Sequence, residues 1–233
     1  MSTNDLPHAM DALTLPPPPD SASALVPQRN TVADTWDWLW KDTLLRVTPF
    51  ALAGVWYLRH SKGEVSSSPR AVAREALVGL AWGVPMAGVA AAFRAWEAPR
   101  YRLPTAADQA LQTAFYFAVN APAEEVFWRG MIQSAAVNGM RRIPALRRAA
   151  PVLGWTGATA VFGVYHRLGK WSWRSIAGVT VAGGLFGALY EFREPSRRLL
   201  APIIVHGFAT AGFLSWGDAY LHQRARRRAA QGR

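Results

Sequence analysis

Two adjacent carboxylates and an arginine stand inside a long apolar run, where charged side chains are costly. The run extends from Ala106 to Val137 and contains Glu124, Glu125 and Arg129. Each ionised group near the centre of a bilayer costs roughly 2.5–3.5 kcal/mol. A membrane helix keeps such a cluster only where the charges are paired or have a function, so these residues are the first candidates for chemistry.

The spacing within the cluster separates the two acids. Glu125 and Arg129 are four positions apart with the acid first, the order that favours pairing along one helix face. Glu124 lies about 100° further round the helix and lacks that partner. Pro122 removes a backbone donor and frees the carbonyl of Ala118, so a local kink of the helix is expected there. A lone Glu–Arg pair would indicate a structural link between helices, whereas the second acid favours a function.

Two histidines lie in apolar blocks further along the chain. His166 follows Phe162 by four residues, and His206 precedes Thr210 by four. If the blocks form one helical bundle, both histidines and both glutamates can converge on one cavity near mid-membrane depth. A carboxylate near imidazoles in an apolar site can act as a general base on water. Glu124, His166 and His206 could instead ligate a zinc ion with one coordination position open.

Apolar residues collect in blocks separated by short arginine-bearing segments, which is the pattern of a polytopic membrane protein. The chain has 233 residues, of which 51% are hydrophobic. We therefore predict an all-α fold, a membrane helix bundle of about six transmembrane helices. One block carries Gly79 and Gly83, whose spacing lets helices approach closely. The predicted blocks cover about 43–58, 71–93, 106–137, 149–165, 175–190 and 199–220.

The two ends of the chain differ from the blocks. Residues 1–34 are polar and proline-rich and are predicted to form a disordered tail. A membrane-embedded helical domain is assigned to 35–222 and a basic tail to 223–233. Three tryptophans among the charges of 35–42 fit either an interfacial helix at headgroup level or a soluble cap on the bundle.

The net charge of +11 is spread over nearly every segment between the blocks. Because no single basic, aromatic-lined face results, anionic lipids are the expected partner and nucleic acid is not. Loop charges lean towards both termini being cytoplasmic. Arginine supplies 23 of the 26 basic residues, which indicates a GC-rich bacterial genome, so we expect a multi-pass protein of a bacterial cytoplasmic membrane. The absence of cysteine excludes disulfides and a cysteine nucleophile.

The ordered set of motifs resembles the CAAX protease and bacteriocin-processing family, also called the Abi family. It comprises Glu124-Glu125-x-x-x-Arg129, then Phe162-x-x-x-His166, then His206 in the last block. The resemblance extends to Val-Phe-Trp-Arg-Gly-Met-Ile-Gln after the acids, to Gly-Leu-Phe-Gly-Ala-Leu-Tyr-Glu from residue 184, and to Leu-Ala-Pro-Ile-Ile-Val-His-Gly from residue 200. It covers roughly residues 106–217, about half of the chain.

The resemblance implies an intramembrane endopeptidase that cleaves a membrane-associated or lipid-anchored peptide or protein. By analogy with the family, Glu124 is the base that activates water, helped by His166. His206 and the polar residue four positions later stabilise the oxyanion. That residue is usually asparagine in the family and is Thr210 here. A metal-independent reaction is expected, with Zn²⁺ as the alternative cofactor.

Arg129 and Phe162 are expected to support the catalytic set of Glu124, Glu125, His166 and His206. A second class of function stays open, namely a non-catalytic scaffold, an immunity factor or a transporter that uses the same polar cluster. A scaffold would tolerate loss of the Glu124 carboxylate and an enzyme would not.

Overall fold

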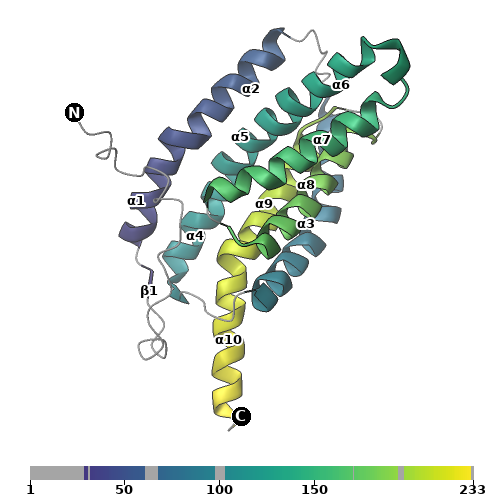
Figure 1. The fold of residues 1–233 in the computed structure, drawn as a ribbon. Coiled ribbons are helices and arrows are strands. Elements are labelled where there is room, and N and C mark those ends of the chain that lie inside the picture. Colours follow the sequence, from purple (N-terminus) through teal and green to yellow (C-terminus); the bar gives the residue numbers. More distant parts are fainter. Residues whose placement is uncertain are drawn as a thin grey trace, which may run out of the picture.

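Each of the six predicted apolar blocks corresponds, to within one residue at its start, to a separate continuous helical rod (Figure 1). The structure, a computed structural model, describes residues 29–30, 32–60, 68–97, 103–169, 171–193 and 197–231. The prediction of an all-α bundle is confirmed. Within the described residues, the rods span 32–60, 69–97, 106–141, 150–165, 173–191 and 200–230.

Three rods are single α-helices and three are built from consecutive helical segments. The single helices are α3 (Pro69–Glu97), α7 (Ala150–Tyr165) and α8 (Trp173–Glu191). The first rod joins α1 (Val32–Asp42), η2 (Thr43–Val47) and α2 (Thr48–His60). The third joins α4 (Ala106–Phe115), η3 (Tyr116–Asn120), α5 (Ala121–Glu125), η4 (Val126–Gln133) and α6 (Ser134–Arg141). The last joins α9 (Leu200–Ala211), η7 (Gly212–Trp216) and α10 (Gly217–Ala230).

The remaining elements are short. They are the 3₁₀ turns η5 (Pro144–Leu146) and η6 (His166–Gly169) and the two-residue strands β1 (Arg29–Asn30) and β2 (Leu103–Pro104). The strands pair in parallel, which ties the chain before α1 to the start of α4. Arg29 and Asn30 lie in the tail that was predicted to be disordered, but they pair with Leu103 and Pro104 as a short strand. Residues 1–28 and 31 of the predicted tail lie outside the described residues.

The segments η2, η3, η4 and η7 are π-helical. A π turn adds one residue to a helical turn and re-aims the side chains that follow, and it occurs frequently at functional sites. Polar side chains of the interior lie in all four segments: Arg46 in η2, Asn120 in η3, Arg129 in η4 and Ser215 in η7. A π turn precedes Pro122, because the amide of Ala121 bonds to the carbonyl of Tyr116, five residues back. The kink expected at Pro122 stays a prediction.

Helices α3 and α9 approach closely through small residues. A β-carbon at Gly79 would overlap Ile204, and one at Gly83 would overlap the ring of Phe208. The close contact predicted from the Gly79–Gly83 spacing is therefore present. At the far end of the same contact, a β-carbon on Gly212 would lie 2.5 Å from the carbonyl oxygen of Ala87.

Among the residues that the structure describes, two helical stretches, Pro69–Arg94 and Leu200–Leu221, are long and apolar enough to cross a membrane by length and composition. Large apolar side chains are also exposed on several helices. On α2, α3, α7 and α8 these exposed side chains include Leu52, Val55, Trp56, Leu77, Leu80, Trp82, Val84, Val89, Val152, Leu153, Val161, Val164, Trp173 and Val181.

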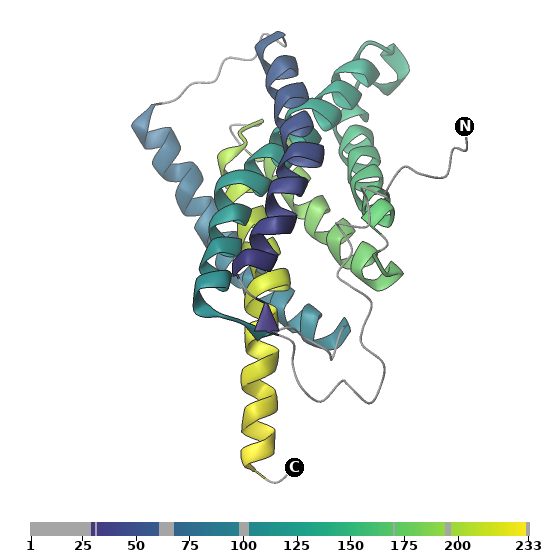
Figure 2. The same ribbon diagram turned by 90° about the vertical axis from the view of Figure 1, so that its left-hand side faces the viewer.

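The first rod differs from the prediction at its start. The helical region begins at Val32, three residues before the predicted domain boundary, and α1 continues through η2 into α2 without a break. Trp36 and Trp40 are exposed, while Thr35 is buried and donates a hydrogen bond to Asp108 of α4. The tryptophan-bearing segment is thus the end of a long rod that packs on α4. At the other end of the chain, α10 extends past the rest of the bundle, so the predicted basic tail continues a helix to Ala230 (Figure 2).

Candidate active site

Glu125 is held from two sides in the centre of the bundle. Its side chain is fully buried and its Oε2 lies 3.3 Å from Nε of Arg129, the partner that the four-residue spacing predicted. Its Oε1 accepts a hydrogen bond of 2.7 Å from Nδ1 of His206, 81 residues away in α9. Glu125 therefore links the third rod to the last one.

Glu124 also has a charged partner, which the spacing of the two glutamates from Arg129 did not predict. Oε1 of Glu124 accepts a hydrogen bond from Nη1 of Arg46, in the first rod. Oε2 lies 3.7 Å from Nε2 of His206. That separation exceeds a hydrogen bond, and within the described part of the chain Oε2 accepts no hydrogen bond. As predicted, Glu124 does not pair with Arg129; its cation is Arg46, which comes from a helix distant in sequence.

His206 lies between the two carboxylates. One ring nitrogen bonds to Glu125 and the other faces Glu124. The imidazole stacks on the ring of Phe186 from α8, with centroids 4.8 Å apart and an interplanar angle of 19°. Because a carboxylate only accepts hydrogen bonds, Nδ1 carries a proton, and the ring orientation is fixed by this bond and by the stacking.

His166 lies at the end of α7, on the edge of the same cluster. Its Nδ1 is 2.8 Å from the carbonyl oxygen of Phe162. A carbonyl can only accept, so Nδ1 carries the proton and the neutral ring keeps a lone pair on Nε2. The ring is close enough to Glu124 for the two groups to interact electrostatically. His166 is thus able to accept a proton or to hold a water near that carboxylate.

The ring of Phe162 separates the two histidines and supports Arg129. It is fully buried, its centroid is 4.9 Å from that of His166 and 6.2 Å from that of His206. The guanidinium carbon of Arg129 lies 4.7 Å from the same ring. Such a contact with an aromatic face stabilises a cation in a dry interior. Phe162 thus contacts both histidines and Arg129, and its supporting role stays a prediction.

Arg129 and Gln133 reach across from η4 to α8. Nη2 of Arg129 donates to the carbonyl of Gly183 over 3.0 Å, and the amide of Gln133 donates to the carbonyl of Gly187 over 3.1 Å. A β-carbon on Gly183 would overlap Phe162, and one on Gly187 would lie 2.6 Å from the side-chain oxygen of Gln133. Gly183 is needed to leave room for the ring of Phe162, and Gly187 to leave room for the side chain of Gln133.

Thr210 lies one turn after His206 in α9 and is half-buried. Its hydroxyl makes no hydrogen bond within the described part of the chain, and in particular none to the carbonyl of His206. The hydroxyl is therefore not occupied by its own helix. Its role as an oxyanion donor stays a prediction.

Three residues near Glu124 were not among the predicted site residues: Asp42, Arg46 and Asn120. Arg46 bonds to Asp42, Asn120 and Glu124 together. The sequence did carry one signal, since Asp42 and Arg46 are an acid-first pair at the start of an apolar block. Arg46 was counted only among the basic loop residues that lean towards cytoplasmic termini, although it lies inside the block predicted to begin at about residue 43.

No group of three histidine, aspartate or glutamate side chains is arranged to hold a metal ion within the residues that the structure describes. Of the alternative zinc ligands, Glu124 accepts from Arg46, and Nδ1 of His206 donates to Glu125. Both side chains are thus engaged with protein partners. Activity measured after chelation tests whether the protein requires a metal.

Comparison with known proteins finds one match. Residues 106–212 match the family model of the type II CAAX prenyl endopeptidase Rce1-like proteins. No curated protein and no solved structure matches the chain. The matched segment runs from the start of α4 to the first residue of η7, so it contains both carboxylates, Arg129 and both histidines. At the level of the family, residues 106–212 of this chain belong with the Rce1-like CAAX prenyl endopeptidases.

Proposed function

We propose that this protein is an intramembrane endopeptidase in which Glu124 activates a water molecule to hydrolyse a peptide bond. The observation that carries the proposal is the meeting of Glu124, Glu125 and His206 inside the bundle, with the imidazole 3.7 Å from one carboxylate and bonded to the other. Oε2 of Glu124 accepts no hydrogen bond from the described residues and so can accept one from water. The family match of this segment supports the same reaction class.

In the proposed reaction, Oε2 of Glu124 takes a proton from water while the water oxygen attacks the carbonyl carbon of the scissile bond. His166 holds the same water through its unprotonated Nε2. The proton on Glu124 then passes to the nitrogen of the leaving amine, which completes the hydrolysis. No metal takes part in these steps, and Zn²⁺ held by Glu124, His166 and His206 is the alternative mechanism.

The oxyanion that forms on the carbonyl oxygen needs hydrogen-bond donors. We assign His206 and Thr210 to this role. Nδ1 of His206 already donates to Glu125, so donation from Nε2 requires a second proton on the ring. The hydroxyl of Thr210 is uncommitted within the described residues and can donate. Glu125 orients His206, and Arg129 balances the charge of Glu125.

The proposed substrate is a peptide or protein at the membrane, and the proposed location is a bacterial cytoplasmic membrane that the chain crosses several times. The exposed apolar side chains on α2, α3, α7 and α8 support this, since large apolar surfaces are rarely left in water. Exposed arginines in the turn between α6 and α7, among them Arg142 and Arg148, support contact with anionic lipid headgroups.

A non-catalytic role is the second candidate, and one observation favours it. Both carboxylates of the cluster are ion-paired, Glu124 with Arg46 and Glu125 with Arg129. Buried pairs of this kind can have a purely structural role. A scaffold or immunity factor would use the cluster in that way and would bind a peptide without cutting it.

The proposal is tested with detergent-purified protein and a library of prenylated and acylated peptides, with products identified by mass spectrometry. We expect cleavage of at least one class of lipid-modified peptide at one defined bond. Folded protein that cuts no member of the library would favour the scaffold. The same assay after exhaustive chelation, and after zinc is restored, separates the metal-free mechanism from the zinc alternative.

A further inference from the structure

Asp42, Arg46 and Asn120 form a network with Glu124 that joins two parts of the chain far apart in sequence. Nε of Arg46 donates to Oδ1 of Asp42 over 2.7 Å, and Nη2 donates to Oδ2 of Asp42 and to Oδ1 of Asn120, each over 2.5 Å. Nη1 donates to Oε1 of Glu124. Every nitrogen of this guanidinium therefore has an acceptor, and all four side chains are held in one arrangement.

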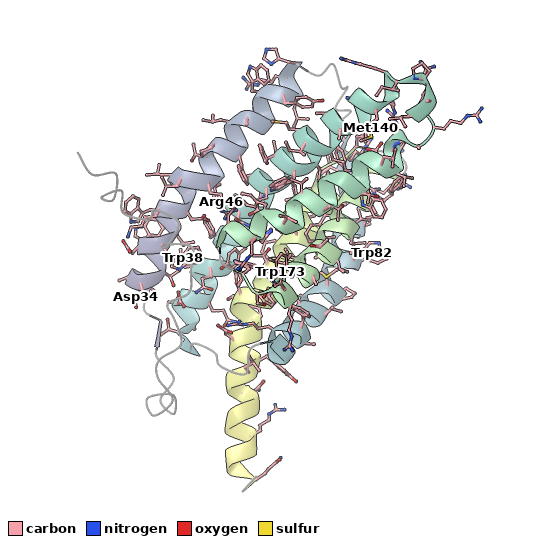
Figure 3. All side chains as sticks on the ribbon, viewed as in Figure 1. Asp34, Trp38, Arg46, Trp82, Met140 and Trp173 are labelled. Carbon is pink, nitrogen blue, oxygen red and sulfur yellow. The ribbon has the colours of Figure 1, made fainter. Side chains whose placement is uncertain are left out.

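The network is largely shielded from solvent. The side chain of Asp42 is 2% exposed, that of Glu124 6% and that of Arg46 15%. In Figure 3 Arg46 lies between the first rod and the helices next to it. A buried cation keeps a fixed position only when its donors are satisfied, and Asp42 anchors Arg46 on its own helix from the side opposite Glu124.

The local backbone explains how Arg46 reaches its partners. Arg46 belongs to the π-helical η2 and Asn120 ends the π-helical η3, one turn before Glu124. The two π turns face each other where the first and third rods meet, since η2 and η3 are in contact. Both distortions lie where the two rods exchange polar contacts.

We infer that Arg46 is a positioning residue for Glu124: it holds Oε1, keeps the carboxylate charged, and leaves Oε2 as the oxygen that receives a proton from water. Its catalytic consequence rests on the proposed function, whereas the contact itself does not. Asp42 and Arg46 lie before residue 106, outside the segment that matches the family. The first rod thus contributes to a site whose other residues all belong to the matched segment.

A membrane-permeant carbodiimide tests the contact without any peptidase assay, because it modifies a buried carboxyl group only in its protonated form. In the full-length protein we expect slow modification of Glu124, located by mass spectrometry. Arg46→Gln should accelerate it about tenfold or more, since an adjacent opposite charge shifts the proton equilibrium of a carboxylate by at least that factor. Arg46→Lys keeps the charge and should stay near the wild-type rate.

Peptide cleavage gives the second readout. Arg46→Gln and Arg46→Lys should lower kcat about 100-fold, the loss expected when a catalytic group is misplaced, and leave KM unchanged. Lysine fails here because it lacks the planar fork that binds three acceptors. Arg94→Gln is the matched control, since it breaks another buried ion pair, with Asp218, and should leave kcat unchanged.

The two readouts separate the possible failures. Modification of Glu124 at the wild-type rate in Arg46→Gln overturns the inference, whatever the protein cleaves. Wild-type kcat in Arg46→Gln also overturns it while leaving the proposed function intact. If the wild-type protein cuts no peptide, the proposed function fails, and the carbodiimide rates alone decide whether Arg46 holds Glu124 in its charged form.

Discussion

At the scale of single residues, Arg129 is the fully buried cation whose loss should cost most. It pairs with Glu125, donates to Gly183 and lies over the ring of Phe162. Arg129→Ala leaves Glu125 buried without its cation, which costs roughly 3–5 kcal/mol for a broken buried pair. We expect a large loss of stability in denaturant titrations of the purified protein. Arg142→Ala, which removes an exposed arginine, is the control, and equal stability of the two variants would refute the role of the pair.

Thr210 is the residue at which the chain departs from the pattern it resembles. Its hydroxyl is uncommitted within the described residues, so it retains the ability to donate to an oxyanion. Losing one such donor costs about 100- to 1,000-fold in rate. On a peptide that the wild type cleaves, Thr210→Asn should therefore raise turnover and Thr210→Val should lower it. Unchanged turnover in both variants would remove Thr210 from the oxyanion site.

At the scale of the elements, the contact between α3 and the last rod depends on close backbone approach. A β-carbon on Gly212 would lie 2.8 Å from Cα of Ala87, and backbone cannot yield as a flexible side chain can. Gly212→Ala should lower stability by about 1–3 kcal/mol, the usual cost of overpacking. Gly88, which also lies in α3, provides the control, because a β-carbon there would have no atom within 4 Å. Gly88→Ala should be neutral or slightly stabilising. A thermal-unfolding comparison in which both variants behave alike would contradict this packing.

The helices could be predicted from the sequence because apolar blocks of 16 to 32 residues have few alternatives in a bilayer. The contact of Glu125 with Arg129 followed from spacing alone. The contact of Arg46 with Glu124 did not, because it depends on which rods are neighbours and on π turns that re-aim side chains by a fraction of a turn. Neither property leaves a periodic signal in one sequence, so the network around Glu124 appeared only in three dimensions.

At the scale of the whole molecule, the exposed apolar surface predicts which positions lipid covers. The chain has no cysteine, so single cysteines can be introduced without background. Val181→Cys, at a residue 75% exposed on α8, should resist a membrane-impermeant maleimide in cells and in lysates. Arg148→Cys, between α6 and α7, should react in intact cells, and Arg227→Cys, near the end of α10, only after lysis. Rapid reaction of Val181→Cys would contradict a lipid-facing surface, and labelling of both arginine positions from one side would contradict the multi-pass arrangement.

The central claim is that Glu124 is a base and not merely half of an ion pair. The most direct test compares Glu124→Gln with Glu191→Gln on a peptide that the wild type cleaves. Both glutamates are buried, and Glu191 lies 3.6 Å from an Arg141 nitrogen and 3.5 Å from an Arg197 nitrogen, so each variant removes one paired carboxylate. We predict that Glu124→Gln lowers kcat at least about 100-fold with the melting temperature close to that of the wild type, whereas Glu191→Gln keeps its turnover. Equal turnover in both variants, at equal stability, would show that the cluster is structural and would contradict the account.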